Sequence, residues 1–77
     1  MAIGFVLITT LPGSESAVRK ALDGIEFVTD RWMLFGEYDL IARVQAGDEY
    51  TLTRCIVEEI RILDGISDTK TLIGAEL

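Results

Sequence analysis

Residues 25–45, IEFVTDRWMLFGEYDLIARVQ, decide the fold of this chain. The segment 25–35 is dense in β-branched and aromatic residues, and 38–45 alternates apolar and polar positions with the two-residue period of a strand. Between them, Gly36-Glu37 offers a tight turn, because glycine readily adopts the backbone angles that hairpin turns require. The stretch therefore predicts a β-hairpin near the middle of the chain.

A helix is expected on each side of this hairpin. Before it, Ser14 or Ser16 can cap a helix that Gly24 ends in the left-handed conformation. The buried stripe of this first helix is predicted to consist of Ala17, Val18, Ala21 and Leu22. After the hairpin, Asp48 is the expected N-cap of a second helix that Gly65 closes. Its apolar face comprises Leu52, Cys55, Ile56, Ile60 and Leu63.

Two outer strands complete the pattern. Residues 2–10 are almost uninterruptedly apolar or β-branched and are stopped by Leu11-Pro12-Gly13, and residues 66–75 form the last strand. The order βαββαβ predicts one α+β domain over residues 1–77, a ferredoxin-like four-stranded antiparallel sheet with both helices on one face. Leu22-Asp23-Gly24-Ile25 recurs as Leu63-Asp64-Gly65-Ile66, through duplication or through shared helix-stop chemistry.

The second face of the sheet is predicted to be covered by another copy of the chain. The strand 2–10 is apolar on both faces, whereas a half-solvated antiparallel strand alternates apolar and polar residues. Trp32 and Met33 fall on opposite faces of their strand, so at least one large side chain there serves an interface. Hydrophobic residues make up 49% of a chain with little interior, which also favours a homo-oligomer.

Charge and cysteine content exclude several classes of partner. Lys and Arg number 7 and Asp and Glu 13, and the net charge of -6 opposes direct nucleic-acid binding. With no His and only Cys55, neither an intrachain disulfide nor a Cys/His metal site is available. The N-terminus has no basic signal-peptide start, and its apolar run is too short to span a bilayer. We expect a cytoplasmic protein without membrane association.

A catalytic site is not expected. No His is available for acid or base work, and Cys55 falls on an apolar helix stripe, where thiols are buried and inert. The serines at 14, 16 and 67 have no partner base to activate them. The sequence therefore predicts neither an enzyme nor a cofactor.

The hairpin turn carries the best candidate for a binding site. Glu37 and Asp39 flank it, and in one interpretation Asp39 merely binds free backbone N–H groups of an ordinary hairpin. In the other, a carboxylate, exposed N–H groups around Gly36 and the Tyr38 ring hold the ammonium, carboxylate and apolar side chain of an amino acid. The residues alone leave both interpretations open.

The motifs together resemble a known family. They are the hairpin 35–44 (FGEYDLIARV), Asp48 with the helix through Ile60, the segment 63–66 (LDGI) and the segment 69–73 (TKTLI). This pattern is similar to the RAM (regulation of amino acid metabolism) domain, the effector-binding half of the Lrp/AsnC, or feast/famine, transcription regulators. The resemblance covers nearly the whole chain.

The resemblance implies a ligand and an assembly. In the family the hairpin turn binds a free amino acid between neighbouring dimers, which implies ligand contacts from Gly36, Tyr38 and Asp39, while Glu37 stands at a variable position. Thr69 and Thr71 match the last-strand motif and are further candidates. The family's dimers pack sheet against sheet and form rings, often octamers of four dimers.

The chain departs from the family in having no helix-turn-helix domain ahead of the first strand, so it resembles a stand-alone RAM domain, and DNA binding is not carried over. We expect an amino-acid-sensing module that alters transcription regulation through its assembly, with full-length Lrp/AsnC regulators as candidate partners. The alternatives are a small enzyme of the dimeric α+β barrel kind, a structural oligomer without ligand, and an ACT domain. The Gly-Glu-Tyr-Asp hairpin fits the RAM pattern better than it fits an ACT domain.

Overall fold

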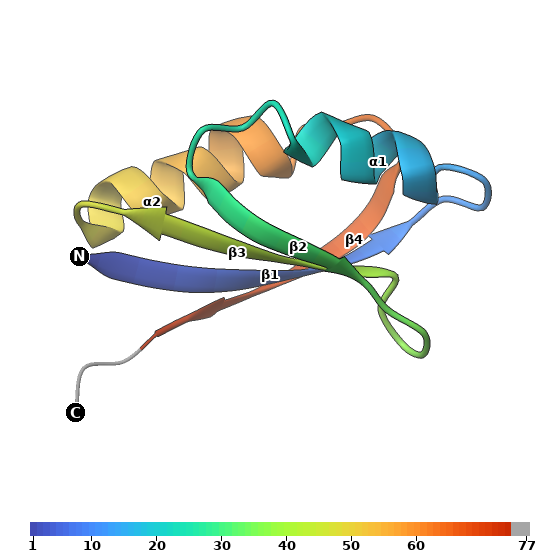
Figure 1. Cartoon of the computed structure of the whole chain (residues 1–77), viewed down its shortest axis with the longest axis horizontal. Coiled ribbons are helices and arrows are strands. Elements are labelled where there is room, and N and C mark those ends of the chain that lie inside the picture. The colour runs from blue at the N-terminus through green and yellow to red at the C-terminus, as the bar shows by residue number, and fades with distance from the viewer. Residues whose placement is uncertain (75–77) are drawn as a thin grey trace.

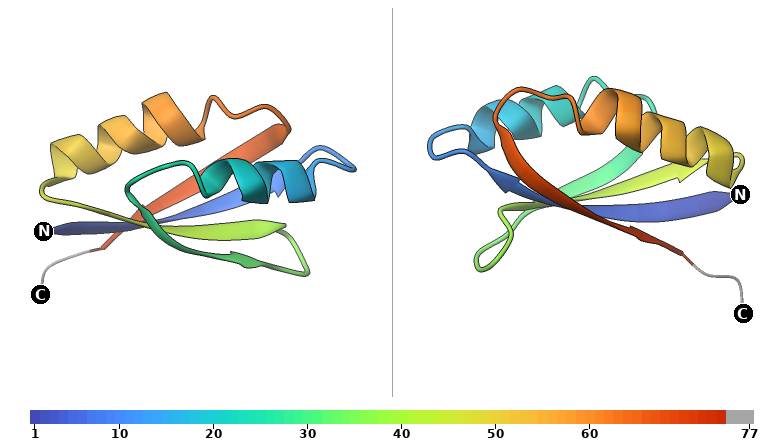
Figure 2. Two further views of the ribbon diagram at one scale, coloured as in Figure 1. Left: turned by 45° about the horizontal axis from the view of Figure 1, so that its top comes forward. Right: turned by 180° about the vertical axis from the view of Figure 1, so that it is seen from behind.

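The computed structural model describes residues 1–74 and confirms the predicted element order. The elements are β1 (Ala2–Thr10), α1 (Glu15–Leu22), β2 (Val28–Met33), β3 (Leu40–Ala46), α2 (Glu49–Cys55), its π-helical continuation η1 (Ile56–Ile60) and β4 (Ile66–Ile73). The strands form one sheet in the order β2-β3-β1-β4, with all neighbours antiparallel. Both helices cover the same face (Figures 1 and 2), so the fold is ferredoxin-like.

The core lies between the helices and this covered face. Every second residue of β1 and β3 points into it, as the period of a strand requires. Its fully buried side chains come from β1, β3 and both helical segments, and they are Val6, Ile8, Val18, Leu22, Leu40, Ala42, Val44, Leu52 and Ile60. The remaining face of the sheet has no covering element from residues 1–74.

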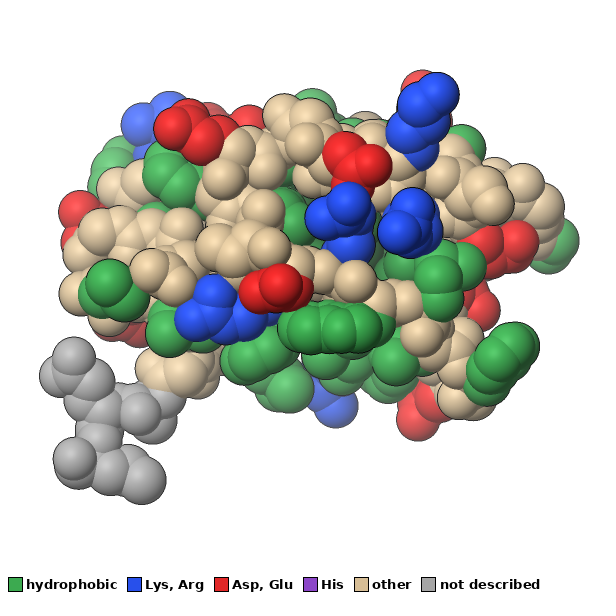
Figure 3. All heavy atoms as spheres, viewed as in Figure 1, with side chains coloured by type: hydrophobic (Ala, Val, Ile, Leu, Met, Phe, Trp, Pro, Cys, Tyr) green, Lys and Arg blue, Asp and Glu red, His purple; other side chains and the backbone are tan. Residues whose placement is uncertain are grey.

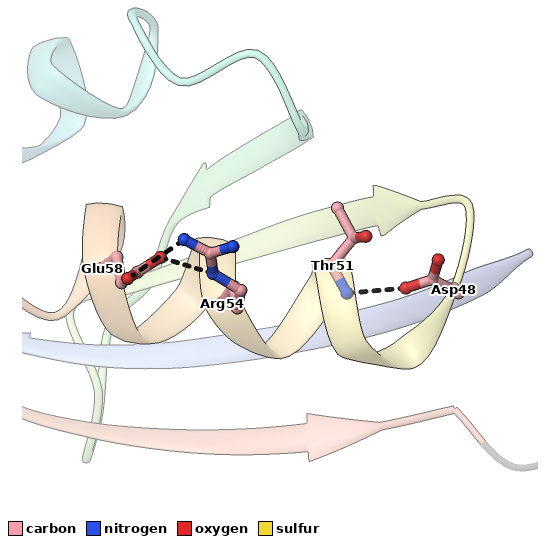
Figure 4. Close-up of polar contacts among 4 residues, drawn as sticks. All are labelled: Asp48, Thr51, Arg54 and Glu58. Carbon is pink, nitrogen blue, oxygen red and sulfur yellow. Dashed lines mark hydrogen bonds and ion pairs between the residues drawn. The ribbon is translucent and has the colours of Figure 1, made fainter.

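The start of α2 follows the expected capping pattern. The Asp48 carboxylate accepts a hydrogen bond from the Thr51 backbone N–H at 2.7 Å (Figure 4), which satisfies one of the unpaired donors of the first turn. This bond lowers the pKa of Asp48. One turn further on, Arg54 pairs with Glu58 at 2.9 Å along the exposed side of the helix. These two local interactions therefore stabilise both the start and the continuation of the helix.

The first helix departs from the prediction at its end and on its stripe. Gly24 does not adopt a positive φ, because hydrogen bonds from Asp23 N–H to the Lys20 carbonyl and from Gly24 N–H to the Ala21 carbonyl tighten the last turn instead. Ala17 is exposed, since in so short a helix only the Val18 side meets the sheet. The predicted left-handed Gly24 and buried Ala17 are therefore wrong.

Gly65, by contrast, is left-handed as predicted, with φ +93. A Cβ atom there would lie 2.8 Å from the Ser14 Cβ and 3.1 Å from the Val18 side chain. The Gly65 carbonyl also accepts a hydrogen bond from Leu11 N–H at 2.8 Å. The turn before β4 is thus pressed against the N-terminus of α1, which only a glycine permits.

The hairpin is less tight than expected. The strand predicted from residue 25 begins at Val28, because Ile25 is held in a turn in which its carbonyl accepts from Val28 N–H. The two strands are joined by the six residues 34–39 instead of a two-residue turn, with Leu34 N–H bonded to the Asp39 carbonyl at 2.8 Å. β4 ends at Ile73, and the predicted last residue Ala75 lies outside the described residues.

Candidate ligand-binding site

The loop of residues 34–39 projects from one end of the sheet, beyond the ends of β2 and β3 (Figure 1). Gly36 at its tip has φ +132, a conformation that side chains disfavour. Gly36 and Glu37 are exposed, Tyr38 is half-buried, and the Phe35 ring is fully exposed. The loop therefore offers backbone groups and an aromatic ring to an outside partner.

Asp39 fastens this loop to β1. One carboxylate oxygen, Oδ2, accepts from Thr10 N–H at 2.8 Å and from the Thr10 hydroxyl at 3.2 Å. The Asp39 N–H donates to the Ile8 carbonyl at 2.8 Å. Asp39 thus binds a backbone N–H group of β1 and not one of the hairpin itself, while its Oδ1 makes no hydrogen bond to residues 1–74.

The two threonines lie apart from the loop. Thr69 pairs with Ile8 of β1, which in turn pairs with Leu40, so Thr69 is about 10 Å from the start of β3. Thr71 pairs with Val6 and lines a shallow cavity of about 270 Å³ between β4 and the second helix. One copy of the chain therefore brings Gly36, Glu37, Tyr38 and Asp39 together but does not add Thr69 or Thr71 to them.

The uncovered face of the sheet carries a cluster of apolar side chains, with Gln45, Arg43 and Lys70 beside Ile3, Phe5 and Leu7 on the same face. Trp32 stands beside Ile41 and Ile41 beside Leu7 across three strands, and Phe5 is paired with Leu72. Trp32 is 48% exposed and Leu72 49%. We call this surface the open face, and it consists of Ile3, Phe5, Leu7, Trp32, Ile41 and Leu72. Hydrophobic side chains gather along the side of the molecule away from the helices (Figure 3).

A second cavity, of about 200 Å³, was not predicted from the sequence. It lies between Phe27 and the outer side of α2, where the Arg54 guanidinium stands 5.8 Å from the centre of the Tyr50 ring. The spacing of Tyr50, Arg54 and Glu58 by four residues is the signal that could have located it. Cys55 also lines it, but burial raises the pKa of this thiol to about 11, so it is no nucleophile at neutral pH.

No three His, Cys, Asp or Glu side chains of residues 1–74 converge in a way that could hold a metal ion. None of the helices in this part of the chain is both long enough and apolar enough to cross a membrane.

Residues 1–74 define a class: a ferredoxin-like domain with an exposed loop at one end of the sheet and a cluster of apolar side chains on the sheet face that the helices leave uncovered. Comparison with known families gives a finer result. The family model described as the Lrp/AsnC ligand binding domain matches residues 3–75. This chain belongs to that family, which is the regulatory ligand-binding domain of transcription regulators.

Solved structures support the same assignment. The chain is similar to FFRP-DM1, with 33% identity, 97% of this chain and 100% of that one covered, and a TM-score of 0.92. It is similar to the hypothetical protein PHS023 from Pyrococcus horikoshii, with 32% identity, coverage of 100% and 93%, and a TM-score of 0.91. The transcriptional regulator NMB0573 of Neisseria meningitidis, solved as an L-Met complex, shares the fold at 12% identity and TM-score 0.85; this chain is covered to 97% and that one to 50%. Comparison with curated proteins yields no match.

Proposed function

We propose that this domain is a non-catalytic sensor that binds a free amino acid at the loop 34–39, at a site completed by a second copy of the chain. The observation that carries the proposal is the loop itself. Asp39 is held by Thr10 through one oxygen only, and next to it stand the exposed backbone at Gly36 and the half-buried Tyr38 ring. These groups match the ammonium, the carboxylate and the side chain of an amino acid.

The incompleteness of the site in one chain supports a shared site. Gly36 and Glu37 are exposed, Phe35 has no cover, and no Cβ at Gly36 would meet another atom within 4 Å. Small-molecule sites normally bury most of their ligand, which a loop so exposed does not achieve alone. The family description and the L-Met complex of the regulator named above agree with an amino-acid ligand. Thr69 and Thr71 then belong to the site only if another copy contributes them.

The open face supports the homodimer that this site needs. Its apolar residues come from all four strands. A sheet with apolar side chains on both faces is stable when another layer covers each face. Dimers joined at this face can associate further through their loops into a ring such as an octamer. Full-length Lrp/AsnC regulators have domains of the same family, so they are candidate partners through which binding affects transcription. The net charge of -6 disfavours a direct contact with nucleic acid, and we place the protein in the cytoplasm, where free amino acids are sensed.

A thermal-shift screen of the twenty amino acids tests the proposal. A ligand that binds only the folded state raises Tm, so we expect at least one amino acid to do so at millimolar concentration. Asp39→Asn keeps an oxygen for Thr10 but removes the charge, and it should lose most of that rise. Asp30→Asn, an exposed carboxylate on β2, is the matched control and should keep it.

Two results would contradict the proposal in different ways. If no amino acid raises Tm of the wild type, the sensing function fails and a structural oligomer without ligand is the better description. If the rise is the same in Asp39→Asn and in wild type, the amino acid binds elsewhere, and the cavity beside Tyr50 becomes the site to examine.

A further inference from the structure

Within residues 1–74, the outer edge of β4 has a row of backbone hydrogen-bonding groups that no other strand pairs with. β4 is the last strand of the sheet and pairs with β1 on one side only. Gly74 N–H donates to the Ile3 carbonyl at 2.7 Å, so with the alternation of an antiparallel ladder Leu72, Lys70 and Asp68 also direct their backbone groups toward β1. The residues between them, 69, 71 and 73, direct theirs outward, while Ser67 lies at a register shift between β1 and β4.

We propose that this edge pairs with the same edge of a second copy, antiparallel and centred on Thr69, which joins the two sheets into one of eight strands. Thr69 then faces Thr69 of the second copy as a hydrogen-bonded pair, and Ser67 faces Thr71. Thr69 and Thr71 can make these bonds because their backbone groups point outward. This interface uses the backbone edge of β4, whereas the open face uses side chains, among which Leu7 stands beside Lys70. It needs no bound amino acid.

The charges on β4 select this register. Centring on Thr69 sets Asp68 opposite Lys70 of the second copy, and the two-fold symmetry repeats the pair. Centring on Asp68 or on Lys70 would set like charges directly opposite each other, which is destabilising. Centring on Ser67 or Thr71 shortens the overlap and sets a charge opposite Ile66 or Leu72. Asp68 and Lys70 are exposed, and neither forms an ion pair with another residue of 1–74.

The surroundings of the edge also suit a second copy. The cavity beside β4 is lined by Val57, Thr71 and Ile73 among others, and Val57 is 46% and Ile73 40% exposed. In a joined sheet the second helix of each copy would lie near its counterpart and cover these side chains. The other sheet edge is less suitable, because β2 has six residues, whereas β4 has eight.

Charge reversal tests the interface. Asp68→Lys sets lysines opposite each other twice per pair of copies, and Lys70→Asp does the same with aspartates. We expect each to weaken association through this edge by about tenfold or more in sedimentation equilibrium. The double variant D68K/K70D should restore it. Glu26→Lys and Lys20→Asp, both exposed, make the same changes of net charge away from β4 and should leave association unchanged.

Cross-linking tests the register. Residues 68 and 70 would form a non-hydrogen-bonded pair with Cα atoms about 4.5 Å apart, within the range of a disulfide. A mixture of D68C and K70C should therefore cross-link on mild oxidation, whereas either variant alone should not. The buried Cys55 gives the wild type no reactive thiol of its own. Cross-linking of D68C with itself, or unaltered association in both single charge reversals, would overturn the proposal.

The outcome is independent of amino-acid sensing. Asp68 and Lys70 are not residues of the loop 34–39. The D68K variant should therefore keep any rise in Tm that an amino acid causes in the wild type. A rise retained in D68K with its edge association lost supports both proposals. Unchanged edge association together with a retained rise overturns the edge interface alone.

Discussion

Asp39 is predicted to stabilise the fold before any ligand binds. Its Oδ2 accepts from the backbone N–H of Thr10, a residue that is only 6% exposed. Asp39→Ala leaves this buried donor without an acceptor, and the loss of a charge-assisted hydrogen bond of this kind costs about 2 kcal/mol. For 77 residues the entropy of unfolding is about 0.16 kcal/mol per kelvin, so Tm should fall by about 12 °C.

Thermal unfolding followed by circular dichroism, at one protein concentration because association also affects Tm, measures this fall. Asp39→Asn retains an acceptor oxygen and should lose about half as much. Glu37→Ala, at an exposed position two residues away in the same loop, should change the free energy of unfolding by less than about 0.5 kcal/mol. An Asp39→Ala protein as stable as Glu37→Ala would refute the anchoring role of this carboxylate.

Four further predictions concern other parts of the molecule. Asp48→Ala should lower Tm at neutral pH, and because the folded-state pKa of Asp48 is depressed, the difference from wild type should disappear as pH falls below 3.8 through that folded pKa. The pKa of Cys55 is raised to about 11, so at pH 8 its thiol should react with a thiol reagent far more slowly in the folded protein than in the urea-unfolded protein. The contribution of Cys55 to the stability of the fold is present below about pH 9 and is lost as pH rises toward 11. Gly65→Ala should destabilise by at least about 2 kcal/mol in urea unfolding, owing to the positive φ and the 2.8 Å approach to a neighbouring side chain, whereas Gly47→Ala, where a Cβ meets nothing, should have little effect. Trp32→Lys should leave the fold intact but reduce dimerisation through the open face in sedimentation velocity.

The order of elements follows from residue patterns that are local in the sequence. The alternation predicted for residues 38–45, where the structure has β3 over Leu40–Ala46, and the Asp48 cap act through near neighbours. The left-handed Gly65 is also found as predicted. The order βαββαβ likewise predicts that both helices leave one sheet face uncovered, as residues 1–74 have it, while the cover of that face by a second copy, expected from the apolar β1, stays a prediction. Such features are readable because period and capping chemistry need no knowledge of the rest of the chain.

The features that the sequence did not disclose depend on contacts between distant segments. The bond between Asp39 and Thr10 joins residues 29 positions apart, and nothing in the hairpin indicates it. α1 ends at Leu22 without a left-handed Gly24, and its C-cap Asp23 pairs with Arg31 of β2, a residue of another element. The separation of Thr71 from the loop follows from strand order, which a linear motif does not contain.

The central claim is that a free amino acid binds where copies of this chain meet, and sedimentation velocity of the wild type with and without each amino acid tests it most directly. We predict that an amino acid that raises Tm also shifts the distribution toward larger assemblies, because the ligand completes a contact between loops 34–39. An amino acid that raises Tm yet leaves sedimentation unchanged over a range of protein concentrations would place the whole site within one copy and contradict the claim.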